Sequence, residues 1–452
     1  MNADAPTAVE RISPDDLTQL ACDVGPAPMQ IAAILILDNA STLEPSAVRA
    51  AIADRIRRVP RLRQRLVRTP PGCGRPIWVD DPRFGIRHHV HWVPCPAPGD
   101  EQALLAVAAT IATKRLPADR PLWSATLVTD LAHGKAGLVV VLHHVVADGI
   151  AGLAVLSSLL DGGSGAPNPG FPRPAPTWRQ LLADTTSGRL RGLTALRSPA
   201  RRLRHAAAEL QPARTGPAPA SSLNQQTGPN RRLAIASTEL AAARDVAHAY
   251  GGTVNDVLLT AVTGALHALL RHRSEHVERL VVSIPASARR TAGGTGNQVG
   301  VIPVELPTGG DALQRLQAIA RITQARKSAP RGASTALLGP AFRTLARMGL
   351  FHWFINHQRL VNTFVTNLRG PEHRLSFLGA PITGLNAVTV VPGNVTVTFA
   401  ALSYAGTLTV TVVADPDRCP DLPVLSRHLQ DELDTLASGR ASLSRPRDRG
   451  RP

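Results

Sequence analysis

The sequence predicts a mixed α/β protein built as two lobes, and three observations lead to this fold class. The 452 residues are enough for two hydrophobic cores and too many for one ordinary domain. Strand-like and helix-like apolar patterns alternate over residues 10–161 and again over residues 223–437. Between them, residues 162–222 are rich in Pro, Gly, Ser and Arg, which is typical of a basic crossover linker. The Arg- and Pro-rich residues 438–452 are predicted to be a disordered tail.

In the first lobe, runs of apolar and β-branched residues alternate with segments of helical period. We expect strands at residues 30–37, 123–128 and 137–144, and helices at 45–57, 104–115 and 150–160.

In the second lobe, Thr253 followed by Asp256 forms a capping-box pattern that starts a helix over residues 255–271. The other expected elements are strands at 280–284, 298–306 and 363–367, helices at 311–328 and 341–358, and a hairpin of 394–399 with 407–413.

The charge balance limits the partners that the surface can take. Fifty Lys and Arg against 33 Asp and Glu give a net charge of +17. Anionic lipid headgroups or a polyphosphate such as coenzyme A suit this surface. Nucleic acid is not expected, because the Arg clusters lack interleaved aromatic residues and no nucleic-acid-binding motif is present.

Cysteine usage and the N-terminus favour a cytoplasmic location. Cys22, Cys73, Cys95 and Cys419 show no paired spacing, so neither a disulfide framework nor a metal site is expected. No signal peptide pattern is present, and the apolar stretch 136–160 is interrupted by polar residues. We therefore expect a soluble cytoplasmic chain, with peripheral attachment to the inner membrane or to lipid inclusions as an open alternative.

The run His-His-Val-Val-Ala-Asp-Gly at residues 143–149 carries the clearest chemical signal. Adjacent residues at a strand end point to opposite faces, so either His143 or His144 faces a pocket while the other supports it from behind. Asp148 and Gly149 follow in a strand-to-helix loop, where Gly permits backbone angles that other residues avoid. A neutral imidazole can take a proton from an alcohol that attacks a carbonyl.

A thioester is a suitable acyl donor for such a site, because its thiolate leaves readily without a covalent enzyme intermediate. The sequence lacks the Gly-x-Ser-x-Gly elbow, the Walker lysine and the dinucleotide-binding fingerprint. His272, Glu275 and His276 match a zinc-binding spacing, but they lie at a charged helix end without a third ligand. No metal and no cofactor are expected.

Two asparagines are further candidates. Asn255 opens the helix after Thr253, where capping is the plain interpretation and orienting an acceptor or stabilising an oxyanion is the functional one. Asn367 ends a strand before Gly370-Pro371, where turn chemistry competes with an oxyanion role. The aromatic residues between 342 and 354 fit either core packing or a lipid-facing amphipathic helix beside basic residues.

The His-His run resembles the active-site signature of the chloramphenicol acetyltransferase-like superfamily, which includes peptide-synthetase condensation domains. Further blocks resemble the bacterial bifunctional wax ester synthase/diacylglycerol acyltransferase family and run from about residue 12 to 417. They are Ser13-Pro-Asp-Asp, Pro28-Met29-Gln30-Ile31, Leu116-Pro-Ala-Asp-Arg-Pro-Leu-Trp123, Leu223-Asn224, Arg231-Arg232, Thr253-Val-Asn255-Asp256-Val257, Gly296-Asn297 and Thr366-Asn-Leu-Arg-Gly-Pro371.

The resemblance implies two chloramphenicol acetyltransferase-like lobes with an active-site tunnel between them. It also implies His144 as general base, His143 as its support, and transfer of a long-chain acyl group from acyl-CoA to diacylglycerol. A long-chain alcohol acceptor, which would give wax esters, stays open, as does a weakly catalytic lipid- or acyl-CoA-binding member. Arg369 stands where many members have proline, which leaves the acceptor open.

Condensation domains pair the aspartate that matches Asp148 with an arginine from an early helix-to-strand segment. The matching segment here selects Arg63, with Arg65 as second choice, and we expect an Arg63–Asp148 ion pair that fixes the loop around His144. Asp148 is accordingly expected to be structural.

Overall fold

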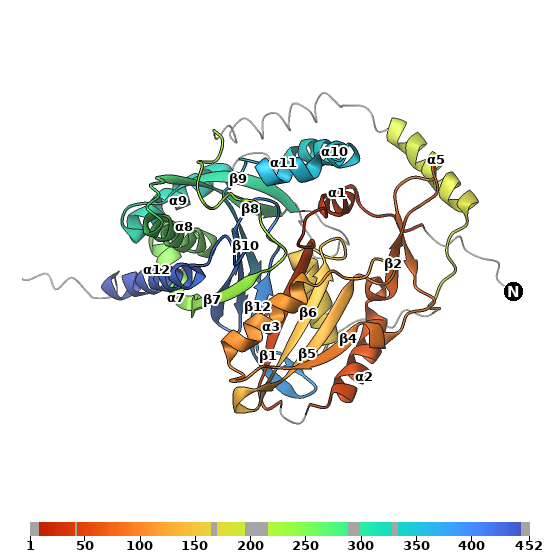
Figure 1. The fold of residues 1–452 in the computed structure, drawn as a ribbon, viewed down its shortest axis with the longest axis horizontal. Coiled ribbons are helices and arrows are strands. Elements are labelled where there is room, and N and C mark those ends of the chain that lie inside the picture. Colours follow the sequence, from red (N-terminus) through yellow and green to blue (C-terminus); the bar gives the residue numbers. More distant parts are fainter. Residues whose placement is uncertain are drawn as a thin grey trace, which may run out of the picture.

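The structure is a computed structural model that describes residues 9–40, 43–163, 170–194, 216–287, 299–327 and 333–443. These residues form two lobes, each built on a six-stranded β-sheet (Figure 1). The predicted mixed α/β class is confirmed. Residues 195–215 of the predicted linker and the predicted tail beyond residue 443 lie outside the described residues.

The N-terminal lobe contains a six-stranded sheet and a separate two-stranded one. Their strands are β1 (Gln30–Leu37), β2 (Gln64–Val67), β3 (Ile77–Asp80), β4 (Val90–Pro94), β5 (Trp123–Leu131), β6 (Lys135–His143), β11 (Ser376–Phe377) and β12 (Ala380–Val388). The large sheet has the order β11-β12-β1-β6-β5-β4, and β2 pairs with β3. β1 and β6 run antiparallel with Gln30 opposite His143, so the predicted histidine strand lies in the middle of the sheet.

Helices cover both faces of this sheet. α2 (Pro45–Arg55) and α4 (Gly149–Leu159) cover one face, and α3 (Glu101–Thr113) covers the other. α1 (Pro14–Cys22) lies beyond the strand ends (Figure 1). Val140 and Leu142 of β6 share a core with residues of α2 and α4, whereas Val139 and Val141 pack with α3. Alternation along β6 therefore sends even-numbered residues toward α4 and odd-numbered ones toward α3.

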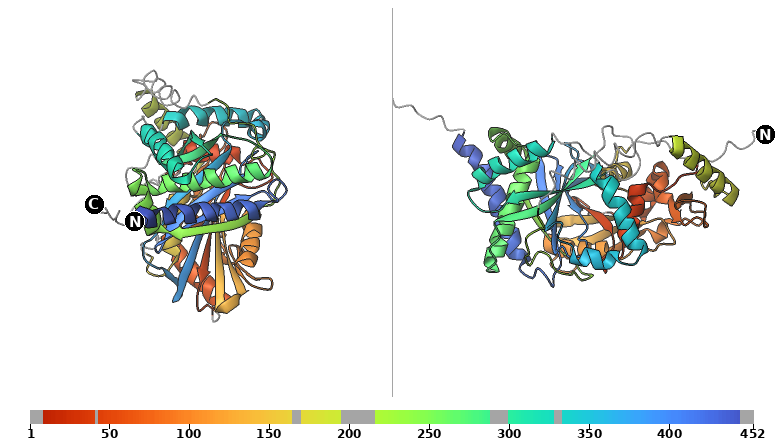
Figure 2. Two further views of the ribbon diagram at one scale, coloured as in Figure 1. Left: turned by 90° about the vertical axis from the view of Figure 1, so that its left-hand side faces the viewer. Right: turned by 90° about the horizontal axis from the view of Figure 1, so that it is seen from above.

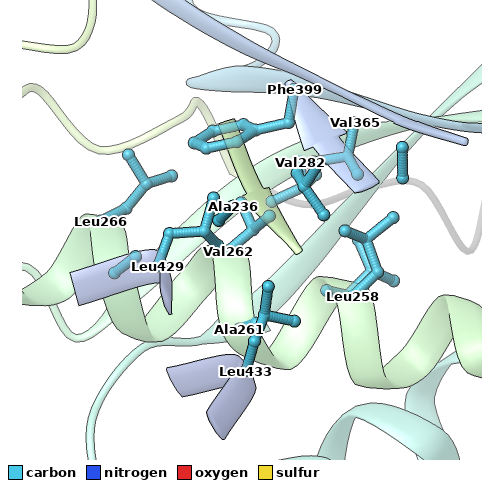
Figure 3. Packing of buried hydrophobic residues seen from close by; sticks show 14 of the residues in the cluster. Ala236, Leu258, Ala261, Val262, Leu266, Val282, Val365, Phe399, Leu429 and Leu433 are labelled. Atoms are coloured by element: carbon cyan, nitrogen blue, oxygen red, sulfur yellow. The ribbon is translucent and has the colours of Figure 1, made fainter. Parts of the chain in front are cut away.

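The C-terminal lobe is also built on a six-stranded sheet, and its helices cover the outer face of that sheet (Figure 2). Its strands have the order β7-β14-β13-β10-β8-β9. The bounds are β7 (Arg232–Glu239), β8 (Arg279–Ser287), β9 (Val299–Pro307), β10 (Thr363–Arg369), β13 (Val397–Tyr404), β14 (Thr407–Ala414), α7 (Leu240–Ala249), α8 (Val254–His272), α9 (Ala312–Lys327) and α12 (Leu422–Leu443). Figure 3 shows Leu258 and Val262 of α8 among strand residues such as Phe399.

The predicted start of α8 is confirmed. Thr253 and Asp256 form the expected reciprocal capping box. Asp256 also accepts a hydrogen bond from the Thr323 hydroxyl of α9 at 2.7 Å, which ties the helix start to its neighbour. No single helix among the described residues is long and apolar enough to span a bilayer; only α7 and α8 together pass on length and composition, and they are bent by 95°.

The predicted range 223–437 for the C-terminal lobe is wrong in one respect. β11 and β12 fall inside that range, yet β12 pairs with β1 and extends the N-terminal sheet. The segment contains Pro381, Thr383 and Asn386 among its apolar residues, so its local pattern does not say which sheet it joins. The lobes are therefore connected by β11 and β12, which the C-terminal half of the chain contributes to the N-terminal sheet.

Three further boundaries differ from expectation. The predicted linker contains α5 (Trp178–Thr194), which is held to the N-terminal lobe by the 2.6 Å Arg11–Asp184 ion pair. The predicted tail starts too early, because α12 continues through Leu443. The single helix expected over 341–358 is two helices, α10 (Ala333–Arg347) and α11 (Phe351–His357), separated at Gly349, whose φ of 71° does not fit a helix.

Candidate active site

The loop between β6 and α4 carries the His-His motif. The His144 N–H donates to the Met29 carbonyl at 2.9 Å, and the Val146 N–H donates to the His143 carbonyl at 2.8 Å. Asp148 is the N-cap of α4 and accepts a hydrogen bond from the Ala151 N–H at 2.8 Å. These bonds fix the loop at the junction of strand and helix.

His143 lies behind this loop and is buried. Its Nδ1 accepts the Val145 N–H at 3.1 Å, so its proton belongs on Nε2, which lies 3.3 Å from the Asp23 carboxylate. The ring is thus held on both sides and faces away from the pocket. This is the geometry that the supporting role predicted for His143 requires.

Asp23 is a site residue that sequence reasoning missed. It follows α1, accepts the Met29 N–H at 3.1 Å, and accepts a 2.6 Å hydrogen bond from Arg115. Burial disfavours its charged form, but the hydrogen bonds from His143 and Met29 and the Arg115 charge more than compensate and hold the pKa of Asp23 below its usual value. No local motif marks Asp23, because His143 lies 120 positions further along the chain.

His144 points to the opposite side of the strand end, toward α4. It is only half-buried, and it borders two cavities. Burial lowers the pKa of His144 below its ordinary value, because the imidazolium loses hydration; a backbone hydrogen bond and the Asp148 charge oppose this only in part. The side chain is therefore a neutral base at pH 7.

Cavity 1, of about 200 Å³, lies between α4, the N-terminal sheet and strands β10 and β13. Its walls are mostly aliphatic, with His144 at one end. The lining residues are Ile31, Ala32, Ala33, Val140, Leu142, His144, Asp148, Gly149, Ile150, Gly152, Leu153, Leu156, Thr366, Asn367, Leu368, Leu385, Ala387, Val388, Thr389, Ala400 and Leu402.

Cavity 2, of about 270 Å³, lies on the other side of His144, between the 25–29 loop, α1, α10 and α11. It is wider and carries more polar groups, including Arg231 and Asn356. His144, Thr366 and Thr389 border both cavities, so a chain in one can meet a chain in the other at the imidazole.

A mechanism with a covalent acyl-enzyme would need a nucleophilic side chain at the site. Cys22 is a candidate, because it lines cavity 2. Burial raises the pKa of its thiol to about 12. The thiolate, which is the reactive form, is therefore scarce at neutral pH. An acyl-cysteine intermediate at this position is disfavoured.

The predicted Arg63–Asp148 ion pair is wrong. The Arg63 guanidinium lies 4.0 Å from the centre of the Phe171 ring and donates to the Arg57 carbonyl at 3.3 Å. Desolvation lowers the pKa of Arg63, and the nearby Asp80 charge opposes that shift. Arg63 thus faces the crossover segment, which enters the lobe where Arg173 binds Asp80 at 2.8 Å. The structural role expected for Asp148 takes a different form, that of a helix cap.

The reason for glycine at 149 also differs from the expectation. Gly149 is the first residue of α4, and its φ is not among the positive values. A Cβ at this position would lie 2.8 Å from Cδ2 of Leu368 on β10. Glycine at this position leaves room for the Leu368 side chain, because the second lobe packs directly against the helix start.

Of the two predicted asparagines, only Asn367 borders a cavity near His144. Asn255, in the first turn of α8, lines neither cavity, and the capping box at this helix start is formed by Thr253 and Asp256. Asn367 borders cavity 1, but it stands opposite Ala401, which belongs to the helix-covered core. Strand alternation therefore gives the cavity face to Thr366, a residue that sequence reasoning passed over.

Among the residues that the structure describes, no group of three or more His, Cys, Asp or Glu side chains could hold a metal ion. Glu275, which belongs to the zinc-like spacing, accepts the Ser222 N–H at 2.8 Å instead. What the site offers chemically is a neutral base between two mostly apolar cavities, with the hydroxyl-bearing residues Thr366 and Thr389 bordering both.

Comparison with known proteins agrees with this chemistry. Family models described as the wax ester synthase/diacylglycerol acyltransferase catalytic domain and the WS/DGAT C-terminal domain match residues 12–258 and 295–437. A Mycobacterium tuberculosis protein described as a probable diacylglycerol O-acyltransferase is 30% identical over 427 residues, which is 91% of each chain.

Two solved structures share the fold. The wax ester synthase/diacylglycerol acyltransferase from Marinobacter aquaeolei VT8 matches with a TM-score of 0.69 and 22% identity, covering 96% of this chain and 100% of that one. A starter condensation domain of rhizomide synthetase, in complex with C8-CoA and Leu-SNAC, matches with a TM-score of 0.62 and 18% identity, covering 98% and 96%. The predicted arrangement of two chloramphenicol acetyltransferase-like lobes is confirmed.

Proposed function

We propose that this chain, which belongs to the wax ester synthase/diacylglycerol acyltransferase family, transfers a long-chain acyl group from acyl-CoA to diacylglycerol and forms triacylglycerol. The observation that carries the proposal is the position of a neutral His144 where two apolar cavities meet. The family and the enzyme class rest on the relatives; the acceptor is our inference from the cavities.

The reaction needs two proton transfers, the first to His144 and the second from it. His144 takes the hydroxyl proton of the acceptor as its oxygen bonds to the thioester carbonyl carbon. The tetrahedral intermediate then expels the thiolate, the C–S bond breaks, and the imidazolium returns the proton to give free CoA–SH. The lowered pKa of His144 keeps the base neutral before each turnover. The scheme uses no cofactor and no metal, with acyl-CoA as substrate.

Both substrates need an apolar surface, and the two cavities offer it. Burial of each CH₂ group contributes about 0.8 kcal/mol, so a long alkyl chain along the aliphatic wall of cavity 1 is strongly favoured over a short one. Cavity 2 is wider and leads toward α10 and α11, which suits a branched glycerolipid. Thr366, at the junction, is our candidate for a hydroxyl donor to the oxyanion; its hydroxyl now donates to the Phe399 carbonyl over a long 3.4 Å and would turn from it to the oxyanion.

A long-chain alcohol acceptor, which would give wax esters, is the second candidate. The family description names both activities, and the same apolar walls accept a single alkyl chain. A weakly catalytic lipid- or acyl-CoA-binding protein is the third. We further propose a cytoplasmic protein that attaches peripherally to the inner membrane or to lipid inclusions, with no nucleic-acid partner.

The test is incubation with labelled acyl-CoA against diacylglycerol, hexadecanol and a small polar alcohol, followed by separation of the lipids. His144→Ala serves as the matched inactive variant. Labelled triacylglycerol from wild type, absent with the variant, supports the proposal, and wax ester alone selects the second candidate. Efficient acylation of only the polar alcohol would refute both.

A further inference from the structure

Large apolar side chains are exposed on one edge of the molecule, on and around α10 and α11. Met348, Leu350 and Leu360 are exposed, and Trp353 is 63% exposed. Behind them, Phe342, Phe351 and Phe354 form a buried or half-buried ring cluster with centroids 5.5 to 6.0 Å apart. The three phenylalanine rings therefore pack together on the inner side of these helices, while the outer residues are exposed.

α5 lies on the same side of the molecule (Figures 1 and 2), and it also exposes apolar residues. Trp178 is 58% and Leu190 is 65% exposed, and Leu182 is exposed between them. Their spacing of four and eight residues places them along one side of the helix. Leu181 and Asp184, which fasten α5 to the lobe, use the other side.

The charge of this edge is strongly positive. Residues 333–360, which contain α10 and α11, include no Asp or Glu but three Arg. Arg347 and Arg359 are exposed beside the apolar side chains of α10 and α11, and Arg179 and Arg189 are exposed on α5. The one acidic residue of α5, Asp184, is already paired with Arg11.

Cavity 2 reaches the same edge. Its walls include Phe342 of α10 and Phe351, Ile355 and Asn356 of α11. The inner side of this helix pair therefore borders the space beside His144, while its outer side carries the exposed apolar residues.

We infer that the face formed by α5, α10 and α11 docks on an anionic phospholipid bilayer, and that cavity 2 receives the acceptor lipid from it. Exposed Trp and Leu side chains enter the interfacial layer, and the flanking arginines bind headgroup phosphates. The inference rests on the proposed function for the identity of the acceptor, but the docking itself does not depend on catalysis.

A second copy of this chain fits the face less well than a bilayer does. A symmetric dimer presents the same patch from both copies, so the exposed arginines of both would be brought together. An anionic membrane supplies the opposite charge and, with its hydrocarbon layer, also covers the apolar side chains.

The experiment measures sedimentation of the full chain with vesicles of phosphatidylcholine alone and of phosphatidylcholine with phosphatidylglycerol. Wild type is expected to bind the anionic vesicles. A double variant, Met348→Ser with Trp353→Ser, should bind them about tenfold more weakly. Arg347→Gln with Arg359→Gln should lose most of the preference for anionic vesicles and become less sensitive to salt.

The matched control is Trp92→Ser. Trp92 is 48% exposed but lies on β4, an edge strand of the N-terminal sheet, and neither cavity includes it. It should leave vesicle binding unchanged. Variants that bind as wild type, or an equal loss with Trp92→Ser, would overturn the inference. The inference would also be overturned if the variants lost only self-association, measured by light scattering, and kept vesicle binding.

Activity on detergent-dispersed substrates separates this inference from the proposed function. Trp353 and Met348 line neither cavity 1 nor cavity 2, so their variants should keep that activity, which also shows that they are folded. Vesicle binding without acyl transfer by wild type would refute the proposed function and leave the docking face intact.

Discussion

Asp23→Asn is the substitution with the most specific expected effect away from His144. The Asp23 carboxylate accepts hydrogen bonds from three donors: the Met29 N–H, Arg115 and His143 Nε2. An asparagine amide has one oxygen and one NH₂ group. If the oxygen takes the place of Oδ2, which accepts from Arg115 and His143, the Met29 N–H faces the NH₂ group, and in the reverse orientation the other two donors face it. His143 cannot resolve this by moving its proton to Nδ1, because that nitrogen accepts the Val145 N–H.

The expected cost follows from the burial of each partner. Arg115 is half-exposed, and an ion pair of that kind contributes about 0–1 kcal/mol. The bond to His143 is buried, and a hydrogen bond to a charged group contributes about 1.5–3 kcal/mol, toward the lower end at 3.3 Å. The unfolding free energy should therefore fall by about 1–3 kcal/mol. Because the pKa of Asp23 is lowered in the fold, this difference should be present at neutral pH and fade as the pH falls through that lowered pKa.

Activity should fall as well, because the 25–29 loop is a wall of cavity 2 and Met29 holds the His144 backbone. We expect kcat to drop about tenfold, since a small misplacement of a catalytic group is costly. The assay compares urea unfolding and steady-state kinetics of Asp23→Asn with Arg115→Gln, which removes only the half-exposed partner. Unchanged unfolding and kcat in Asp23→Asn, or an equal loss in Arg115→Gln, would refute the reasoning.

Three further outcomes are expected. Because burial lowers the pKa of His144, kcat/KM should stay level from pH 8 to about 6.5 and fall only below it; a fall already complete at pH 7 contradicts the assignment. Gly149→Ala should cost about 1–3 kcal/mol by contact with Leu368, whereas Gly152→Ala, whose Cβ meets nothing closer than 3.5 Å, should be tolerated; equal urea midpoints refute this. Asp148→Asn should keep most activity, since Asn also caps helices, while Asp148→Ala should lose about 1 kcal/mol of stability; a large loss of kcat in Asp148→Asn at unchanged stability indicates a direct role.

Local sequence patterns predicted the features that depend on near neighbours. β1 has the bounds expected from its apolar run, and the Thr253 capping box is formed as the spacing indicated. Alternation at the end of β6 separates the two histidines, with His143 held behind the sheet and His144 at the cavities. Each of these follows from geometry within a few residues.

The predictions that were wrong concern contacts between residues that lie far apart along the chain. β12 joins the sheet of the other lobe, a choice made by tertiary packing. Arg63 turns to Phe171 because the crossover segment passes beside it. Gly149 is explained only by Leu368, which lies in the opposite lobe. A single sequence offers no spacing rule for such pairs.

The most direct test of the account is the rate of acyl transfer from acyl-CoA to diacylglycerol by His144→Ala, with acyl-CoA binding measured on the same preparation. Loss of the general base should lower kcat at least ~100-fold while the affinity for acyl-CoA stays near that of wild type. A variant that binds acyl-CoA normally and still forms triacylglycerol at a rate near wild type would contradict the central claim that His144 is the base.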